Sequence, residues 1–131
     1  MTLKQLAADP GFYAAGVAGA PVAQWELYDT AYTERYMGDP RTVKAAYDKA
    51  GVLAEATRIK DPLLLIHGMS DDNVILSNTT AVASALQAAN APFEMMLYPG
   101  EAHSAVGGGK APHVWNTIMR FLKAHGVTPP E

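Results

Sequence analysis

One stretch decides the fold of this chain: Leu63-Leu64-Leu65-Ile66-His67-Gly68-Met69-Ser70-Asp71-Asp72-Asn73-Val74. Four consecutive large aliphatic residues, with a proline before them and a small polar loop after them, are typical of a strand buried on both faces. Such strands occur in parallel sheets, where chemistry collects at the carboxyl ends of the strands. We therefore place the candidate functional site in the polar loop that follows this strand.

The rest of the sequence predicts helices and further strands around this central strand. Helices are expected from Met1 to about Asp9, within Arg41–Ile59, over Thr79–Ala89 and after Pro112, and strands within Tyr13–Ala20 and over Phe93–Tyr98. We expect Asn78 to be the N-cap of the helix that follows it. The order α-β-α-β-α-β-α predicts an α/β fold with about three parallel strands and helices on both faces.

Composition bounds the class of protein. The 131 residues, 49% of them apolar, are enough for one domain with a real core. A net charge of −3 without a basic stripe excludes a nucleic-acid binder, and no apolar run is long enough to cross a membrane. Because cysteine is absent, thiol chemistry is excluded. The compartment stays open between cytoplasm and periplasm, because we expect any signal peptide to lie upstream of Met1.

A second strand end carries a histidine, in Tyr98-Pro99-Gly100-Glu101-Ala102-His103. An imidazole works as a general base when a buried carboxylate holds its other nitrogen. Asp71 and His103 are far apart in the sequence, but the predicted sheet brings their strand ends together, and Asp72 competes as the acid. We interpret His67 as a structural residue that bonds the loop backbone.

A metal site is the first alternative, since the aspartates and histidines of both strand ends are possible ligands. None follows a recognised ligand spacing. The calcium-loop pattern also fails, because Ile75 and Leu76 stand where it needs polar residues or glycine. We therefore expect neither a metal nor any other cofactor.

The sequence contains an acid and a base but lacks a recognisable nucleophile. No Gly-x-Ser-x-Gly motif occurs, and none of the serines sits in a predicted strand–turn–helix elbow: Ser70, Ser77, Ser84 and Ser104. In α/β-hydrolases the chain order is Ser, then Asp, then His. We therefore expect the nucleophile elbow upstream of Met1.

An aromatic segment precedes the central strand. Trp25, Tyr28 and Tyr32 follow an i, i+3, i+7 spacing, so on a helix they share one face. This face is either a stripe of the core or the wall of an apolar slot, and spacing alone leaves both readings open.

Two stretches resemble the dipeptidyl peptidase IV branch of the prolyl oligopeptidase family. They are Ala20-Pro21-Val22-Ala23-Gln24-Trp25-Glu26-Leu27-Tyr28-Asp29-Thr30-Ala31-Tyr32-Thr33-Glu34-Arg35-Tyr36-Met37-Gly38 and His67-Gly68-Met69-Ser70-Asp71-Asp72-Asn73-Val74. The resemblance covers nearly the whole chain and matches the carboxyl-terminal portion of that family's α/β-hydrolase domain. Residues 1–131 are therefore expected to be part of such a domain, with the amino-terminal strands, the nucleophile elbow and a β-propeller outside the chain.

The resemblance also implies a role for individual residues. Asp71 is implied to be the triad acid, His103 the triad base, and Asn73 a donor to a substrate carbonyl. The implied wall of a pocket for a proline or alanine ring consists of Val22, Trp25, Tyr28, Tyr32 and Val74. Ser104 departs from the glycine that follows the histidine in many members, which leaves the loop uncertain but not the base.

We expect the intact protein to be a serine peptidase of dipeptidyl aminopeptidase type, which cleaves peptides after Pro or Ala near their amino terminus. The chain alone is then expected to be inactive. Two alternatives stay open: a non-catalytic, self-associating α/β module, or part of another serine hydrolase such as an acyl-peptide hydrolase or esterase. We also expect a homo-oligomer, formed by the exposed strand edge around Val17 or by swapped elements.

Overall fold

The sheet has three parallel strands, as predicted. A computed structural model describes residues 1–103 and 108–128. In these residues β1 (Gly16–Gly19), β2 (Leu63–Gly68) and β3 (Glu94–Tyr98) form one sheet in the order β1-β2-β3. The helices are α1 (Thr2–Ala8), α2 (Thr30–Met37), α3 (Lys44–Ala50), α4 (Ser77–Ala88) and α5 (Ala111–Ala124), with 3-10 helices η1 (Trp25–Leu27) and η2 (Leu53–Arg58).

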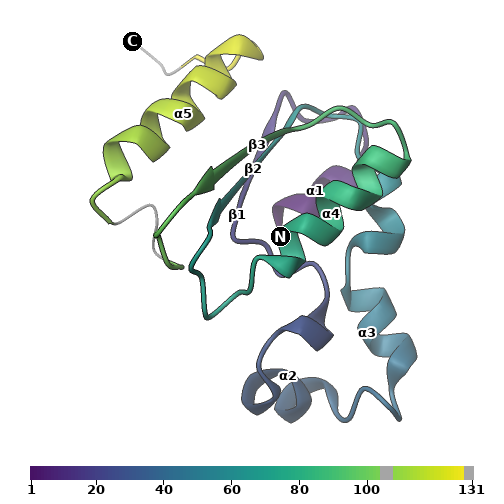
Figure 1. The fold of residues 1–131 in the computed structure, drawn as a ribbon. Coiled ribbons are helices and arrows are strands. Elements are labelled where there is room, and N and C mark those ends of the chain that lie inside the picture. Colours follow the sequence, from purple (N-terminus) through teal and green to yellow (C-terminus); the bar gives the residue numbers. More distant parts are fainter. Residues whose placement is uncertain (104–107, 129–131) are drawn as a thin grey trace.

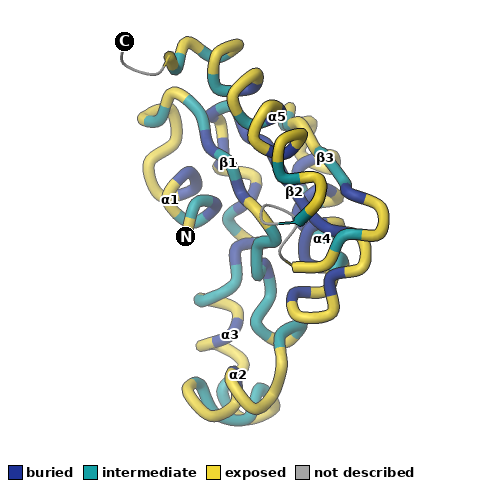
Figure 2. Tube along the Cα trace, turned by 90° about the vertical axis from the view of Figure 1, so that its left-hand side faces the viewer, coloured by how far each residue is buried: buried dark blue, intermediate teal, exposed yellow. Residues whose placement is uncertain are grey.

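The central strand β2 is buried along its whole length because helices cover both faces of the sheet (Figures 1 and 2). Side chains alternate across a strand, so neighbouring leucines enter different layers. Leu63 and Leu65 pack into a core with residues of α1, η2 and α4, whereas Leu64 and Ile66 pack with residues of α5. The predicted arrangement of helices on both faces is confirmed.

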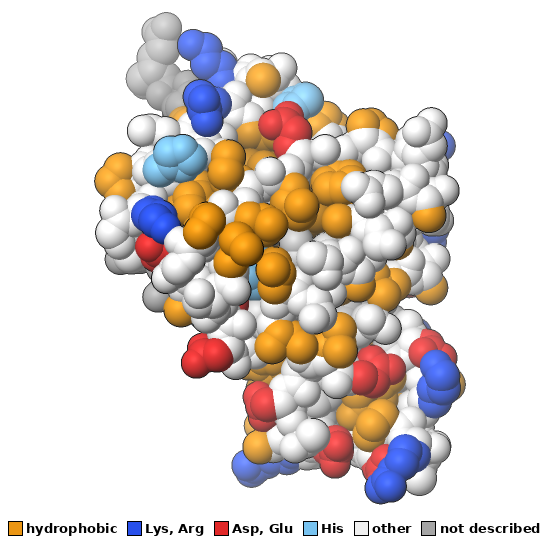
Figure 3. Space-filling model, viewed as in Figure 1, with side chains coloured by type: hydrophobic (Ala, Val, Ile, Leu, Met, Phe, Trp, Pro, Cys, Tyr) orange, Lys and Arg blue, Asp and Glu red, His pale blue; other side chains and the backbone are white. Residues whose placement is uncertain are grey.

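Parts of the chain lie outside these layers. The segment with α2 and α3 extends beyond the sheet, and most of its residues are exposed or half-buried (Figures 1 and 2). Apolar side chains gather on the face over β3, where Met95 is 41% exposed (Figure 3). No helix within the described ranges is long and apolar enough to span a bilayer.

Asn78 is not a helix cap, and that prediction is wrong. Helix α4 begins one residue earlier, at Ser77, and the Asn78 side chain is fully buried. Its Oδ1 accepts hydrogen bonds from the backbone N–H groups of Ala23, at 2.9 Å, and Gln24, at 3.1 Å. The physical reason is helical spacing: Asn78 lies one turn before the buried Val82, so it faces the core and not the helix end.

Replacing Asn78 tests this tether, which consists of its two hydrogen bonds with the backbone of Ala23 and Gln24. Asn78→Ala is expected to lower the free energy of unfolding by about 1–3 kcal/mol, because two backbone N–H groups lose their acceptor. Chemical denaturation measures the change. Ser77→Ala, at the exposed neighbouring position, is the matched control and is expected to change stability by less than about 0.5 kcal/mol. Equal effects of the two substitutions would contradict the tether.

Candidate active site

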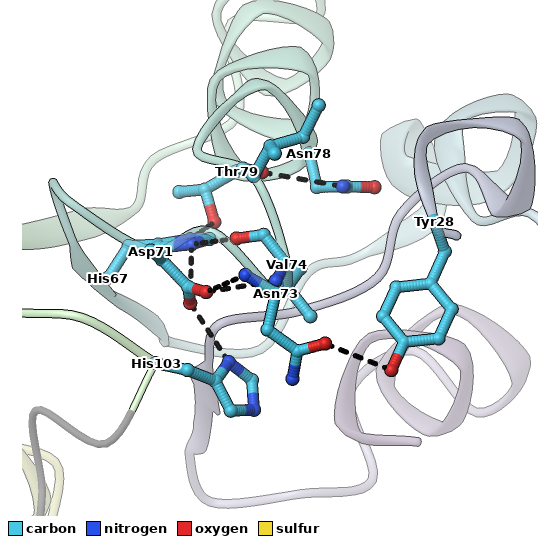
Figure 4. Close-up of polar contacts among 9 residues, drawn as sticks. Tyr28, His67, Asp71, Asn73, Val74, Asn78, Thr79 and His103 are labelled. Atoms are coloured by element: carbon cyan, nitrogen blue, oxygen red, sulfur yellow. Dashed lines mark hydrogen bonds and ion pairs between the residues drawn. The ribbon is translucent and has the colours of Figure 1, made fainter.

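A buried carboxylate lies at the centre of the polar loop after β2. The Asp71 side chain is fully buried, and its Oδ1 accepts hydrogen bonds from the backbone N–H groups of Asn73, at 3.0 Å, and Val74, at 2.9 Å. Its Oδ2 lies 2.9 Å from Nδ1 of His103 and 3.3 Å from Nε2 of His67 (Figure 4). Both carboxylate oxygens therefore face N–H donors.

The partner histidine reaches solvent. His103 keeps 46% of its side chain exposed, whereas the carboxylate that it contacts is fully buried. An ionised carboxylate only accepts hydrogen bonds, so Nδ1 of His103 carries the hydrogen and donates it to Asp71. In the neutral ring Nε2 is then the unprotonated nitrogen. A histidine held in this tautomer, with an accessible Nε2, is suited to take a proton from a nucleophile.

The site keeps Asp71 ionised. Burial raises the pKa of its carboxyl, but the hydrogen bond from His103 and those from the N–H groups of Val74 and Asn73 lower it more. The net result is a pKa below the usual value of 3.8. The carboxylate therefore stays charged near neutral pH, as orienting His103 requires.

A glycine brings the two strand ends together. A side chain at Gly68 would overlap the backbone carbonyl oxygens of Glu101 and Ala102, so the loop that carries His103 rests directly on the end of β2. The backbone N–H of Ser70 donates to the carbonyl of Glu101 at 2.9 Å and holds the two loops side by side. Glycine at this position is thus a geometric requirement of the Asp71–His103 pair.

His67 is a structural residue bonded to the loop backbone, as interpreted from the sequence. Its ring is buried at the carboxyl end of β2, and Nε2 lies 2.8 Å from the carbonyl oxygen of Val74. Its Nδ1 lies 2.6 Å from Oγ1 of Thr79 in α4. Sequence reasoning missed Thr79, although its spacing of four residues from the buried Ala83 places it on the core face of the helix.

The aromatic residues form one group, but not on one continuous helix. Trp25 belongs to η1, and α2 starts only after Asp29, whose side chain accepts from the backbone N–H of Tyr32 at 2.9 Å. The rings of Trp25 and Tyr32 are stacked at 6.3 Å, and that of Tyr28 meets that of Tyr32 edge-on at 5.6 Å. The Tyr28 hydroxyl donates to Oδ1 of Asn73 at 3.1 Å (Figure 4), which joins this group to the polar loop that carries Asp71, called the acid loop.

The other predicted site residues lie around this centre at different depths. Val74 is 3% exposed, and its backbone N–H donates to Asp71, whereas Asp72 is exposed. Val22 lines a recess of about 100 Å³ at the end of β1, together with Gly19. Ser104 lies outside the described residues.

Within the described ranges no three His, Asp or Glu side chains are grouped as a metal site would require.

Comparison of the chain with known proteins shows its family. The model of the prolyl oligopeptidase family matches residues 1–127. The chain belongs to the prolyl oligopeptidase family. Dipeptidyl peptidase 4 of Felis catus is 36% identical over 126 residues, which are 94% of this chain and 16% of the cat protein. Venom dipeptidyl peptidase 4 of Vespula vulgaris is 39% identical over 120 residues, which are 88% of this chain and 15% of the venom protein.

Solved structures of the family have the same fold. The crystal structure of Porphyromonas gingivalis dipeptidyl peptidase 4 gives a TM-score of 0.90 at 39% identity, over 94% of this chain and 18% of that one. A putative dipeptidyl aminopeptidase IV from Bacteroides ovatus gives 0.89 at 30% identity, over 95% and 17%. The chain spans less than a fifth of these relatives and matches the carboxyl-terminal part of the family's serine peptidases. The two alternatives, a non-catalytic, self-associating module and part of another serine hydrolase such as an acyl-peptide hydrolase or esterase, are not favoured.

The lowered pKa of Asp71 predicts a pH dependence of stability. Because the folded-state pKa lies below the unfolded value, the stabilisation is fully present above the unfolded pKa of about 3.8 and is lost as pH falls through the folded value. The difference in unfolding free energy between wild type and Asp71→Asn is therefore expected to shrink as pH falls from about 5 toward 3.

Denaturant titrations at several pH values measure this difference. Asp39 also has a lowered pKa, of about 2, because of its hydrogen bonds with Arg41. It is present in both proteins, so its contribution cancels in the difference. A difference that stays constant down to pH 3 would show that Asp71 gains no stabilisation from its charged form.

Proposed function

We propose that Asp71 and His103 are the acid and the base of a serine peptidase of dipeptidyl aminopeptidase type. The observation that carries the proposal is the 2.9 Å contact between the buried carboxylate and the half-exposed ring. In this mechanism Nε2 of His103 accepts the proton of the attacking serine and returns it to the leaving amine. Asp71 holds the ring in the required tautomer and stabilises its positive charge.

The nucleophilic serine of this proposal lies outside the 131 residues. Ser77 and Ser84 belong to α4, and Ser70 lies in the turn between β2 and the acid, so none of these three occupies a strand–turn–helix elbow. The family's order of Ser, Asp and His along the chain supports a serine in the amino-terminal direction. The elbow, which belongs to the same α/β-hydrolase domain, and the β-propeller are likewise proposed to lie outside residues 1–131.

The aromatic group is proposed as the wall of the substrate pocket. The rings of Trp25, Tyr28 and Tyr32 pack on one another beside the acid loop, and an apolar wall of aromatic faces suits a proline or alanine side chain. Tyr28 holds the Asn73 oxygen, which leaves the amide N–H groups to donate to a substrate carbonyl. Val22, which is partly exposed, would add apolar surface to this wall, whereas the side chain of Val74 is buried and supports it only from within.

A chimera tests the function. Residues 1–127 replace the matching segment of Porphyromonas gingivalis dipeptidyl peptidase 4, which keeps its own serine. The chimera is expected to release p-nitroaniline from dipeptide substrates with proline in the second position, and the 131-residue chain alone is expected to release none. Asp71→Asn should lower kcat of the chimera by about 10⁴-fold, because His103 loses its orienting acceptor.

Asp72→Asn is the matched control, because Asp72 is the exposed neighbour of the acid, and its kcat is expected to be unchanged. A folded chimera that fails to hydrolyse the substrate would contradict the proposal. So would inhibitor-sensitive hydrolysis by the pure 131-residue chain, since the serine would then lie within it.

A homo-oligomer of the 131-residue chain, formed by the edge of β1, is proposed as well. Gly16 and Ala20 donate their N–H groups to the carbonyl oxygens of Pro62 and Ile66, each at 2.8 Å. Because backbone groups alternate along a strand, the N–H groups of Val17 and Gly19 point away from β2. In the described part of the chain no strand pairs with that edge, and such an edge invites pairing with a second copy.

Light scattering of the 131-residue chain is expected to give at least the mass of a dimer. Val17→Pro should give a monomer, since proline removes an outward N–H group without breaking the pairing with β2. Val17→Thr keeps the N–H group and is the control that should remain a dimer. A wild-type monomer at high concentration would contradict edge pairing.

A further inference from the structure

The partners of His67 define which of its nitrogens carries the hydrogen. Nε2 lies 2.8 Å from the carbonyl oxygen of Val74 and 3.3 Å from Oδ2 of Asp71. Both partners are acceptors, so Nε2 must be protonated. Nδ1 lies 2.6 Å from the hydroxyl of Thr79 and, in the neutral ring, accepts the hydrogen of that hydroxyl. The buried ring is thus fixed in one tautomer.

Through this N–H group the ring contacts the acid loop at two points. The carbonyl of Val74 accepts from His67, while the N–H of the same residue donates to Oδ1 of Asp71. The second carboxylate oxygen, Oδ2, lies beside both His67 and His103 (Figure 4). The His67 ring therefore contacts both the backbone turn and the carboxylate of Asp71, and Thr79 of α4 holds the ring itself in place.

A purely apolar packing role does not account for these contacts. A hydrophobic ring of similar volume would leave the carbonyl of Val74 without its donor in a buried place, which is unfavourable. It would also remove the positive end of an N–H dipole from beside Oδ2. The contacts instead match those of residues that hold a catalytic side chain in its working orientation.

We propose that His67 is a positioning residue, whose Nε2–H holds the loop and carboxylate of Asp71 so that Oδ2 receives the Nδ1–H of His103. The inference rests on the proposed function for its catalytic meaning, but its geometry concerns the 131-residue chain alone. The hydroxyl of Thr79 supports this role of His67, because it fixes the tautomer of the His67 ring.

Long-range ¹H–¹⁵N correlation spectra of the histidine rings near neutral pH test the inference in the 131-residue chain. In the wild type we expect protonated Nε2 in His67 and protonated Nδ1 in His103. In His67→Phe the Nδ1–H form of His103 should cease to be the major form, although circular dichroism shows a folded protein. His67→Gln should restore that form, because its amide supplies an N–H donor near the same place.

Thr80→Val, on the exposed neighbour of Thr79, is the control and should leave both rings unchanged. If His67→Phe does not fold, Thr79→Val decides: the loss of the hydroxyl donor should change the His67 signals and weaken the Nδ1–H signal of His103. A folded His67→Phe or Thr79→Val variant in which His103 keeps its wild-type spectrum overturns the proposal, as does a wild-type His67 protonated only on Nδ1.

The two proposals fail separately. An inactive chimera with the expected ring spectra contradicts the peptidase function and leaves the positioning of Asp71 intact. An active chimera in which His67→Phe changes neither the spectra nor kcat contradicts only the role of His67.

Discussion

The structure around the site depends on one ionised carboxylate in a place without water contact. A buried charge is strongly unfavourable unless hydrogen bonds replace its hydration. For Asp71 that replacement comes from two backbone N–H groups of its own loop and from two imidazoles that it contacts with Oδ2. The end of β2, the tight turn after it and the loop after β3 each contribute a donor to Asp71. The need to hydrogen-bond this buried charge therefore fixes the position of all three segments.

The first turn of α4 connects this centre with the aromatic segment. Two neighbouring residues hold different parts of the molecule: Asn78 accepts from the backbone at Ala23 and Gln24, and Thr79 contacts His67. On the solvent side, the hydrogen bond between Tyr28 and Asn73 is a second link between the aromatic segment and the loop of Asp71. The acid and the aromatic group thus share one rigid support, which explains how segments far apart in the sequence keep a common geometry.

Much of this arrangement follows from sequence patterns. The aliphatic run Leu63–Ile66 predicts a buried parallel strand, and the geometry of parallel sheets then places Asp71 beside His103. The tether of Asn78 was not predicted, because a polar residue before a helix is ordinarily a cap and its partners lie more than 50 residues away. The start of α2 after Asp29 was not predicted for a related reason, since a spacing of three and four residues does not reveal a local cap.

The extension with α2 and α3 lies outside the two layers that cover the sheet, and Asn78 holds its beginning through backbone groups alone. A hydrogen bond to a backbone N–H does not depend on which side chain the donor residue carries. The surface that this extension presents can therefore diversify during evolution without loss of its anchorage to the core. Replacement of residues 25–50 as a block, with Asn78 retained, is accordingly a rational way to change this surface while the contact between Asp71 and His103 stays unchanged.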